Sequence, residues 1–233
     1  MKQWLMGLLL SWYCGLAVAA DNFPPSFTAQ YKLYFKGIPA GSGIRSLTRT
    51  PDGKFVFTST AETSGLAALF NESRIEERSV FVQDASEIRP LEYTYHQTGK
   101  KARDDRVSFD WSKKIAKSTY KGVTQEIPLE AGVLDRLLYQ LSLMRELAQG
   151  KQQLHYKIVD KGEIKEYVPK FLGKESIATG LGKLETLKYQ RVSAERSTTF
   201  WCAPTLHFLP AQVEHIEKGD TISMVVETVD SHH

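Results

Sequence analysis

The stretch from Gly132 to Gly150, GVLDRLLYQLSLMRELAQG, decides the fold because it carries a strong helical pattern in a chain otherwise rich in strand patterns. Its apolar residues recur at steps of three and four, the period of one helical face. These residues are Leu134, Leu137, Leu138, Leu141, Met144 and Leu147. Asp135 falls in the first turn, where a negative charge suits the helix dipole, and Gly150 supplies a stop signal. The pattern predicts one amphipathic helix, with Gln140 and Arg145 on its polar side.

Strand patterns fill both sides of this helix. In the first of them, Phe27, Ala29 and Tyr31 alternate with polar residues, as in a strand with one buried face. Turn signals such as Pro51-Asp52-Gly53 separate the segments. The expected strands cover residues 27–36, 44–50, 54–63, 74–83, 91–98, 106–111, 115–120, 152–160, 163–172, 184–193, 197–202, 208–216 and 221–229, with a short polar strand between Gly173 and Gly182. Residues 123–129 are expected to lead into the helix.

About a dozen strands and one helix predict a mainly β fold, a curved antiparallel sheet or open β-barrel with the amphipathic helix packed on it. Because no linker divides the chain, residues 21–233 are expected to form a single β-rich domain. Residues 37–43 are expected to be a loop, and residues 65–70 a short helical turn or apolar loop. The helix is expected to be part of the core, and a mobile lid over a ligand groove is the alternative.

Residues 1–20 have the pattern of a secretory signal peptide, with Lys2 as the only charge, a short apolar run and small residues at its end. Cleavage is expected after Ala19 or Ala20, which predicts a periplasmic protein. An uncleaved membrane anchor is the alternative, although the run is short for a span of about twenty residues. No later apolar run is long enough to cross a bilayer, so any membrane association would be peripheral.

Charge and cysteine content restrict the function classes. The formal net charge of +3 includes Lys2 and is too small to indicate nucleic-acid binding. Cys202 is the only cysteine after the leader, so it has no partner for an internal disulfide. A buried small hydrophobe is the expected role for Cys202, and a reactive thiol is the alternative.

The chemistry-bearing residues form no recognisable motif, so we predict no catalytic, cofactor-binding or metal-binding residue. The scattered histidines are His96, His155, His207 and His215, and none has metal-ligand spacing. The adjacent pairs Asp104-Asp105 and Glu76-Glu77 should face opposite sides of a strand, which makes them poor acid/base partners. The charged run 99–105 is expected to be a solvated loop, with a phosphate or lipid-headgroup site as the alternative.

Two blocks of sequence carry a family resemblance. One is the segment from Arg196 to Asp220, in which an aromatic strand meets Ala203-Pro204 and a second strand runs from Leu209-Pro210 to a Lys-Gly-Asp turn. The other is the segment from Tyr34 to Gly41. Together with the helix they resemble the domain-of-unknown-function 3108 family over roughly residues 27–229. The resemblance implies a secreted or periplasmic bacterial protein, and it implies no activity.

These features favour a non-catalytic protein of the cell envelope, which binds an apolar ligand such as a lipid, or an envelope partner, in a half-barrel groove. Fold alone does not fix function. A periplasmic hydrolase without a recognisable motif is one alternative. A structural or assembly adaptor, which pairs through an exposed sheet edge, is another.

Overall fold

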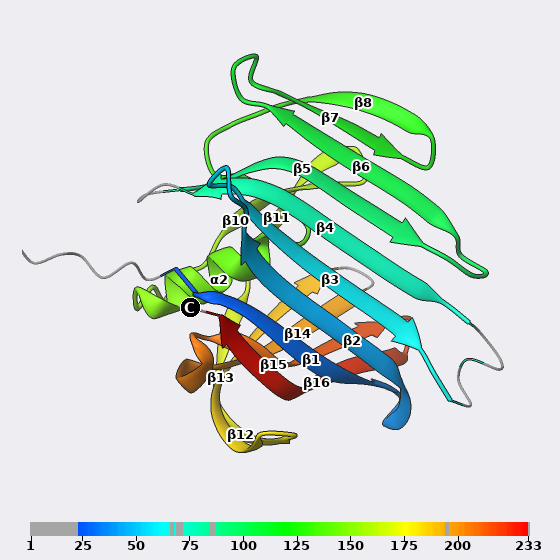
Figure 1. Cartoon of the computed structure of the whole chain (residues 1–233), viewed down its shortest axis with the longest axis vertical. Helices are drawn as coiled ribbons and strands as arrows, with labels where there is room; N and C mark the ends of the chain where they lie inside the picture. The colour runs from blue at the N-terminus through cyan, green and yellow to red at the C-terminus, as the bar shows by residue number, and fades with distance from the viewer. Residues whose placement is uncertain (1–22, 66–67, 69–71, 84–86, 194–195, 233) are drawn as a thin grey trace, which may run out of the picture.

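The computed structural model describes residues 23–65, 68, 72–83, 87–193 and 196–232, and strands dominate it (Figure 1). A single antiparallel sheet of 13 strands forms most of the molecule. In spatial order its strands are β12 (Lys170–Thr179), β13 (Gly182–Ser193), β14 (Arg196–Ala203), β15 (Leu209–Glu217), β16 (Asp220–His232), β1 (Ser26–Phe35), β2 (Ile38–Arg49), β3 (Phe55–Thr63), β4 (Arg74–Gln83), β5 (Ile88–Gln97), β6 (Arg103–Asp110), β7 (Ile115–Tyr120) and β8 (Val123–Pro128).

The strands form a meander in which, from β12 to β16 and from β1 to β8, each strand pairs with the next one along the chain, and the first strand at one edge is β12. Strand β16 pairs with β1, so the last and first strands are neighbours and the two halves of the chain form one surface. Strands β8 and β12 are the two edges of the sheet. The predicted curved sheet or open barrel is therefore confirmed, and the barrel is not closed.

The segment that connects the two edges fills the inside of the curve. It contains β9 (Val133–Asp135), α2 (Tyr139–Ala148), β10 (Tyr156–Asp160) and β11 (Glu163–Tyr167). The three strands form a second small sheet, in which β10 runs parallel to β9 and antiparallel to β11. Figure 1 shows α2 near the beginning of β1, and the Tyr139 ring lies 6.0 Å from the Phe200 ring of β14.

Helix α2 is part of the core, as its apolar stripe predicts. Leu138, Leu141 and Leu143 have no exposed surface, because the helix is covered by both the large and the small sheet. For the same reason the prediction of a polar side is wrong, since Gln140 is only 9% exposed and Arg145 only 8%. Within the described residues, no helix is long and apolar enough to cross a membrane.

The start of the helix was also predicted wrongly. Leu134 and Asp135 belong to β9, and the helix begins only at Tyr139. The reason lies in the Asp135 carboxylate, whose Oδ1 accepts hydrogen bonds from the backbone N–H groups of Leu137 and Leu138. This turn chemistry separates the strand from the helix, and an apolar period cannot reveal it.

Four hairpins turn on a Lys-Gly pair. In each pair both residues have positive φ, the conformation of the type I′ turn that matches the twist of a hairpin. The pairs are Lys36-Gly37, Lys121-Gly122, Lys161-Gly162 and Lys218-Gly219. The first pair leads directly into β2, so the predicted loop at residues 37–43 is wrong beyond Gly37. A Cβ at Gly41 would collide with the Glu62 carbonyl oxygen, so glycine serves close strand packing there.

Other expectations are corrected in detail or remain outside the described residues. The expected strand 163–172 is two strands in different sheets, and β6 begins at Arg103, inside the expected charged loop. Cys202 is fully buried, as predicted, and burial raises its thiol pKa. The expected leader 1–20 and most of the apolar segment 65–70 lie outside the described residues.

Candidate functional site

The concave side of the sheet encloses a cavity of about 610 Å³, here called the interior cavity. It lies beside the helix, since Tyr139 and Gln140 form part of its wall. Apolar side chains from the large sheet line another part of it, and they are Leu33, Ala61, Ile75, Phe200, Val213, Ile222 and Met224. Its volume is within the range of pockets that bury most of a small ligand, about 300–1,000 Å³.

The interior cavity is also cationic. Seven lysine and arginine side chains line it, against three carboxylates. The cations are Arg45, Lys101, Arg103, Arg136, Lys161, Arg191 and Arg196, and the carboxylates are Glu77, Asp160 and Glu217. A cleft lined mainly by one sign of charge attracts ligands of the opposite sign.

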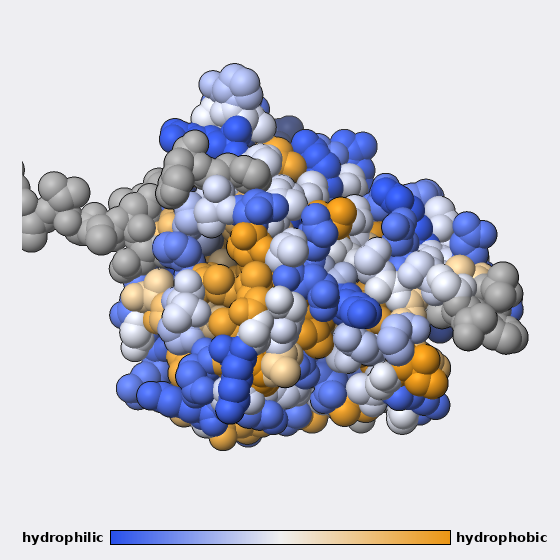
Figure 2. All heavy atoms as spheres, turned by 60° about the horizontal axis from the view of Figure 1, so that its bottom comes forward, coloured by the Kyte–Doolittle hydropathy of each residue, from blue (hydrophilic) through white to orange (hydrophobic). Residues whose placement is uncertain are grey.

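One end of the curved sheet forms the mouth of this cavity. A second pocket of about 650 Å³ shares Leu33, Lys101 and His215 with the interior cavity and adds Phe35. Phe35 is 42% exposed, so the mouth carries apolar surface. Figure 2 views the molecule with the bottom of Figure 1 brought forward, and it shows apolar residues exposed at several places among hydrophilic ones.

Lysines surround this mouth. The first and last of the Lys-Gly turns adjoin paired ends of β1 and β16, where Phe35 faces Ile222. Lys121 and Lys161 lie together farther along, each over the Tyr120 ring. The set is completed by Lys101, so the basic rim consists of Lys36, Lys101, Lys121, Lys161 and Lys218.

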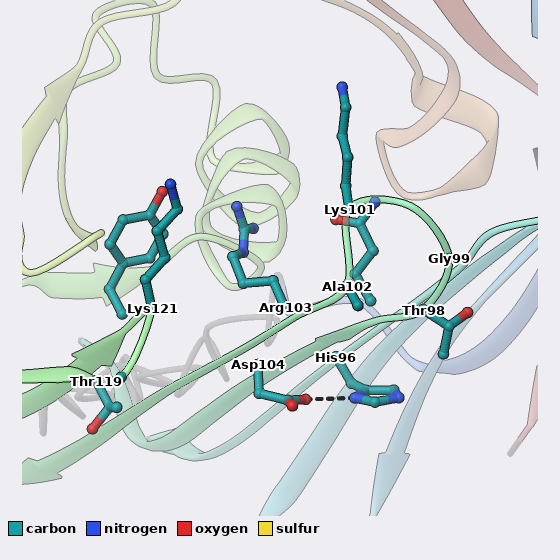
Figure 3. Close-up of a pocket in the computed structure, with 12 residues that line it drawn as sticks. His96, Thr98, Gly99, Lys101, Ala102, Arg103, Asp104, Thr119 and Lys121 are labelled. Atoms are coloured by element: carbon teal, nitrogen blue, oxygen red, sulfur yellow. Dashed lines mark hydrogen bonds and ion pairs between the residues drawn. The ribbon is translucent and has the colours of Figure 1, made fainter.

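The charged run 99–105 contributes to the mouth through a third pocket of about 1040 Å³. Figure 3 shows Lys101 and Arg103 on one side of the β5–β6 hairpin and the His96–Asp104 pair on the other. His96 Nδ1 lies 2.5 Å from Asp104 Oδ1, and both side chains are largely exposed. The run is thus divided between an outer ion pair and cations that face the cavity.

At the helix end of the cavity, Arg136 is the centre of a satisfied ionic network. Its guanidinium lies 3.3 Å from Glu77 Oε1 and 3.4 Å from Asp160 Oδ1, and it donates to the Tyr93 hydroxyl at 2.7 Å. Burial disfavours its charged form, but these partners outweigh burial and raise the Arg136 pKa. The network ties β4, β5 and β10 to the turn before the helix.

The neighbouring Asp135 is a fully buried carboxyl group. Ser79 Oγ donates to its Oδ1 at 2.9 Å, in addition to the two backbone N–H groups before the helix. Burial raises the Asp135 pKa to about 7, against the opposing effect of these hydrogen bonds. This cluster has the perturbed pKa of an active site, but its contacts join structural elements.

Arg45 is buried without such a network. The residue is only 6% exposed, and its Nε and Nη1 have no hydrogen-bond partner. Its Nη2 donates to Met224 Sδ at 3.3 Å, and a thioether is a weak acceptor. Among the described residues, no carboxylate forms an ion pair with Arg45 or with Arg191.

The structure brings His215, one of the four scattered histidines, to the interior cavity. His215 Nδ1 lies 3.0 Å from Thr198 Oγ1, whereas its Nε2 is 3.9 Å from Glu217. The second distance is too long for a hydrogen bond, and Glu217 pairs with Arg196 at 2.8 Å instead. Burial and the two nearby arginines, Arg196 and Arg191, lower the His215 pKa, with Glu217 opposing them. The arrangement does not orient His215 as a general base.

The interior cavity is not lined by His155, His207, Asp104 or Asp105. His155 is 3.4 Å from Glu166 at the surface, and His207 is in the connection from β14 to β15. Asp104 faces outward whereas Asp105 pairs with Arg103 inside, so the expected opposite facing is confirmed. In the part of the chain that the structure describes, no group of three or more His, Cys, Asp or Glu residues could hold a metal ion.

Sequence reasoning missed the arginines of the interior. The available signal was Arg45 itself, because it shares the inward parity of β2 with Gly43 and Leu47, both buried. A charged residue on an otherwise buried strand face indicates a buried partner or ligand. Arg191 gives a weaker signal, since its strand alternates less regularly.

Comparisons with known proteins agree with the fold and match domains of unknown function. The family model described as "Protein of unknown function (DUF3108)" matches residues 30–226. A crystal structure titled as a β-barrel-like protein of domain of unknown function DUF1849 from Brucella abortus is similar, with a TM-score of 0.57 and 6% identity. The similarity covers 90% of this chain and 99% of that one, and shows a shared fold. No curated protein sequence matches this chain.

Proposed function

This chain belongs to the DUF3108 family of proteins of unknown function, and we propose that it is a non-catalytic binding protein that holds an amphipathic molecule in its interior cavity. The observation that carries the proposal is the cavity, about 610 Å³ in volume with apolar and cationic walls. An apolar wall accepts a hydrocarbon body, and the cations favour an acidic or polar end.

The mouth supports the same function. Exposed apolar side chains at Phe35 and Ile222 and the basic rim around them offer both properties to an arriving amphiphile. The rim lysines would raise the local concentration of an anionic ligand, and this steering weakens as salt is added. A membrane lipid or lipid fragment fits this description.

The proposed place of action is the bacterial periplasm. This part of the proposal rests on the leader pattern of residues 1–20 and on the family resemblance in the sequence. Mature protein from the native cell should begin after Ala19 or Ala20. N-terminal sequencing that finds Met1 on the mature chain would contradict export with cleavage.

The test of binding is native mass spectrometry of the protein isolated from its own cell envelope. We expect a bound amphiphile of discrete mass, released by organic solvent. A cavity-filling variant, Ala61→Phe, should lose this species, because Ala61 lines the cavity. The matched control is Ala178→Phe on the exposed face of β12, which should retain it. A ligand-free protein that also fails to bind added dodecanoate and dodecanol would refute the proposed function.

A further inference from the structure

We propose that Arg45, assisted by Arg191, binds the oxyanion head group of the ligand at the inner end of the cavity, while the apolar chain of that ligand extends to the mouth. This inference rests on the binding function proposed above and deepens it. The ligand class that it names is a single-chain amphiphile with a carboxylate or phosphate head.

The first observation is the set of donors on Arg45. Arg45 is only 6% exposed and lines the interior cavity, yet its Nε and Nη1 have no hydrogen-bond acceptor in the protein. Its other contacts are the Met224 sulfur and the Tyr31 ring, whose centroid is 5.3 Å from the guanidinium carbon. Buried donors are nearly always hydrogen-bonded, so an unsatisfied arginine beside a cavity points to a ligand that accepts from it.

The second observation is that most other cavity arginines already have carboxylates. Arg136 pairs with Glu77 and Asp160, and Arg196 pairs with Glu217. The fold therefore supplies acidic partners where the charge is structural. Arg45 and Arg191 lack such partners among the described residues, which leaves two guanidinium groups for a ligand.

Arg191 lines the same cavity as Arg45. Its guanidinium carbon stands 3.7 Å from the centroid of the Tyr167 ring, and its buried Nε has no acceptor. Both Arg191 and Arg45 act electrostatically on the Tyr139 hydroxyl, whose pKa burial raises and these two charges lower. Arg45 and Arg191 thus line the same cavity from β2 and β13.

The chemistry of the head follows from the guanidinium. Its planar fork of N–H donors matches two oxygens of a carboxylate or phosphate, and such charge-assisted pairs are stronger than neutral hydrogen bonds. A neutral alcohol offers a single oxygen without charge. Leu33, Met224 and Ile222 then provide apolar wall toward the mouth, where a chain fits better than a second charge.

The test compares three probes that have the same alkyl chain and differ in the head group, namely dodecanoate, dodecyl phosphate and dodecanol. Their binding is measured by calorimetric titration of the full-length mature protein after delipidation. We expect the wild type to bind at least one of the two anions at least about tenfold more tightly than dodecanol. The preferred anion identifies a carboxylate or a phosphate as the natural head. Arg45→Met should remove about tenfold or more of this anion affinity and leave dodecanol binding unchanged.

Three variants make the result specific. Arg45→Lys keeps the charge but loses the fork, so its anion affinity should lie between those of the wild type and Arg45→Met. Arg191→Met should weaken anion binding in the same direction. Arg49→Met, on the same strand but exposed, should bind like the wild type. Thermal melts establish that each variant is folded, and if Arg45→Met is not, Arg45→Lys and Arg191→Met carry the test.

The outcomes separate the two proposals. Equal affinity for dodecanoate, dodecyl phosphate and dodecanol, unchanged in folded Arg45 and Arg191 variants, would overturn the anion site and leave the binding function intact. Failure of all three probes to bind would overturn the anion site, and it would overturn the binding function as well if the protein isolated from its own cell envelope carries no amphiphile. A preference for anions that Arg49→Met abolishes and Arg45→Met does not would assign the head group to the surface instead.

Discussion

Two arginines that line the same interior, Arg45 buried and Arg136 partly buried, have opposite surroundings. Arg136 lies at the helix end, where Glu77, Asp160 and Tyr93 satisfy its guanidinium. Arg45 lies on β2, where its guanidinium contacts the Met224 sulfur and the Tyr31 ring. The difference teaches that burial of a cation is by itself no sign of function. What matters is whether the fold supplies the counter-charge.

This contrast divides the interior into a structural end and a binding end. The structural end contains α2, β9 and the Arg136 network, all packed against the sheet. The binding end contains the cavity, the mouth and the basic rim. The following experiments either separate these two ends by their effect on stability or show that the division is wrong.

The largest effect is expected at the structural end, from Leu141→Ala. Leu141 has no exposed surface, and truncating such a leucine typically costs about 2–5 kcal/mol through lost transfer energy and the cavity left behind. Urea unfolding should show the upper half of this range. The control Val192→Ala, at a position 69% exposed, should change little. A Leu141→Ala protein with normal stability but poor ligand retention would mean that the helix is a lid.

Arg136→Met should come next. Removing one partner of a buried ionic network typically costs about 3–5 kcal/mol, because it leaves carboxylates without their counter-charge. The Arg136 side chain keeps 18% of its surface exposed, so we expect a smaller loss of about 2–3 kcal/mol. The measurement is again urea unfolding of the ligand-free protein. If Arg136→Met left the free energy of unfolding unchanged or raised it, Arg136 would not be a structural residue and would resemble Arg45.

Sequence alone could predict the larger part of this architecture. Alternation in segments such as residues 27–31 identifies strands, and the leucine period identifies the helix, because both patterns record which face is buried. The resemblance to DUF3108 was confirmed by a match to residues 30–226. The small sheet was missed, since its strand β9 has three residues and lies within the helical pattern.

The binding end could not be predicted in the same way. Arg45 and Arg191 are 146 positions apart in the numbering and line one cavity because β16 pairs with β1 and joins the two halves of the sheet. The pairing of Arg136 with Asp160 likewise depends on the small sheet. A sequence shows which residues are charged, but the counter-charges that decide their role come from tertiary structure.

Asp135 gives a pH-dependent test of the structural end. Burial raises its pKa from the ordinary value of 3.8 to about 7. Between these two pH values the Asp135 carboxyl is protonated in the folded protein and ionised in the unfolded chain. Its contribution to stability is present below pH 4 and is lost as the pH rises through about 7. Asp135→Asn keeps the Oδ1 acceptor and should flatten this part of the stability profile. An unaltered profile in Asp135→Asn would contradict the buried acid.

The smallest expected effect is the most decisive for the comparison, and it concerns Arg45→Met in the ligand-free protein. Methionine removes a charge that has no acidic partner and preserves much of the side-chain volume. Replacing an uncompensated buried cation by an apolar residue is neutral or stabilising, so the free energy of unfolding should stay the same or rise by about 1 kcal/mol.

The same substitution at Arg136 is its internal control, because the two variants lose identical atoms from the same interior. Both are measured by urea unfolding after delipidation, with Arg49→Met as the surface reference. If Arg45→Met lost as much stability as Arg136→Met, the Tyr31 ring and the Met224 sulfur would be sufficient partners, and Arg45 would be structural. If it does not, the fold carries a buried positive charge that contributes nothing to its own stability, which is the expected property of a residue kept for a ligand.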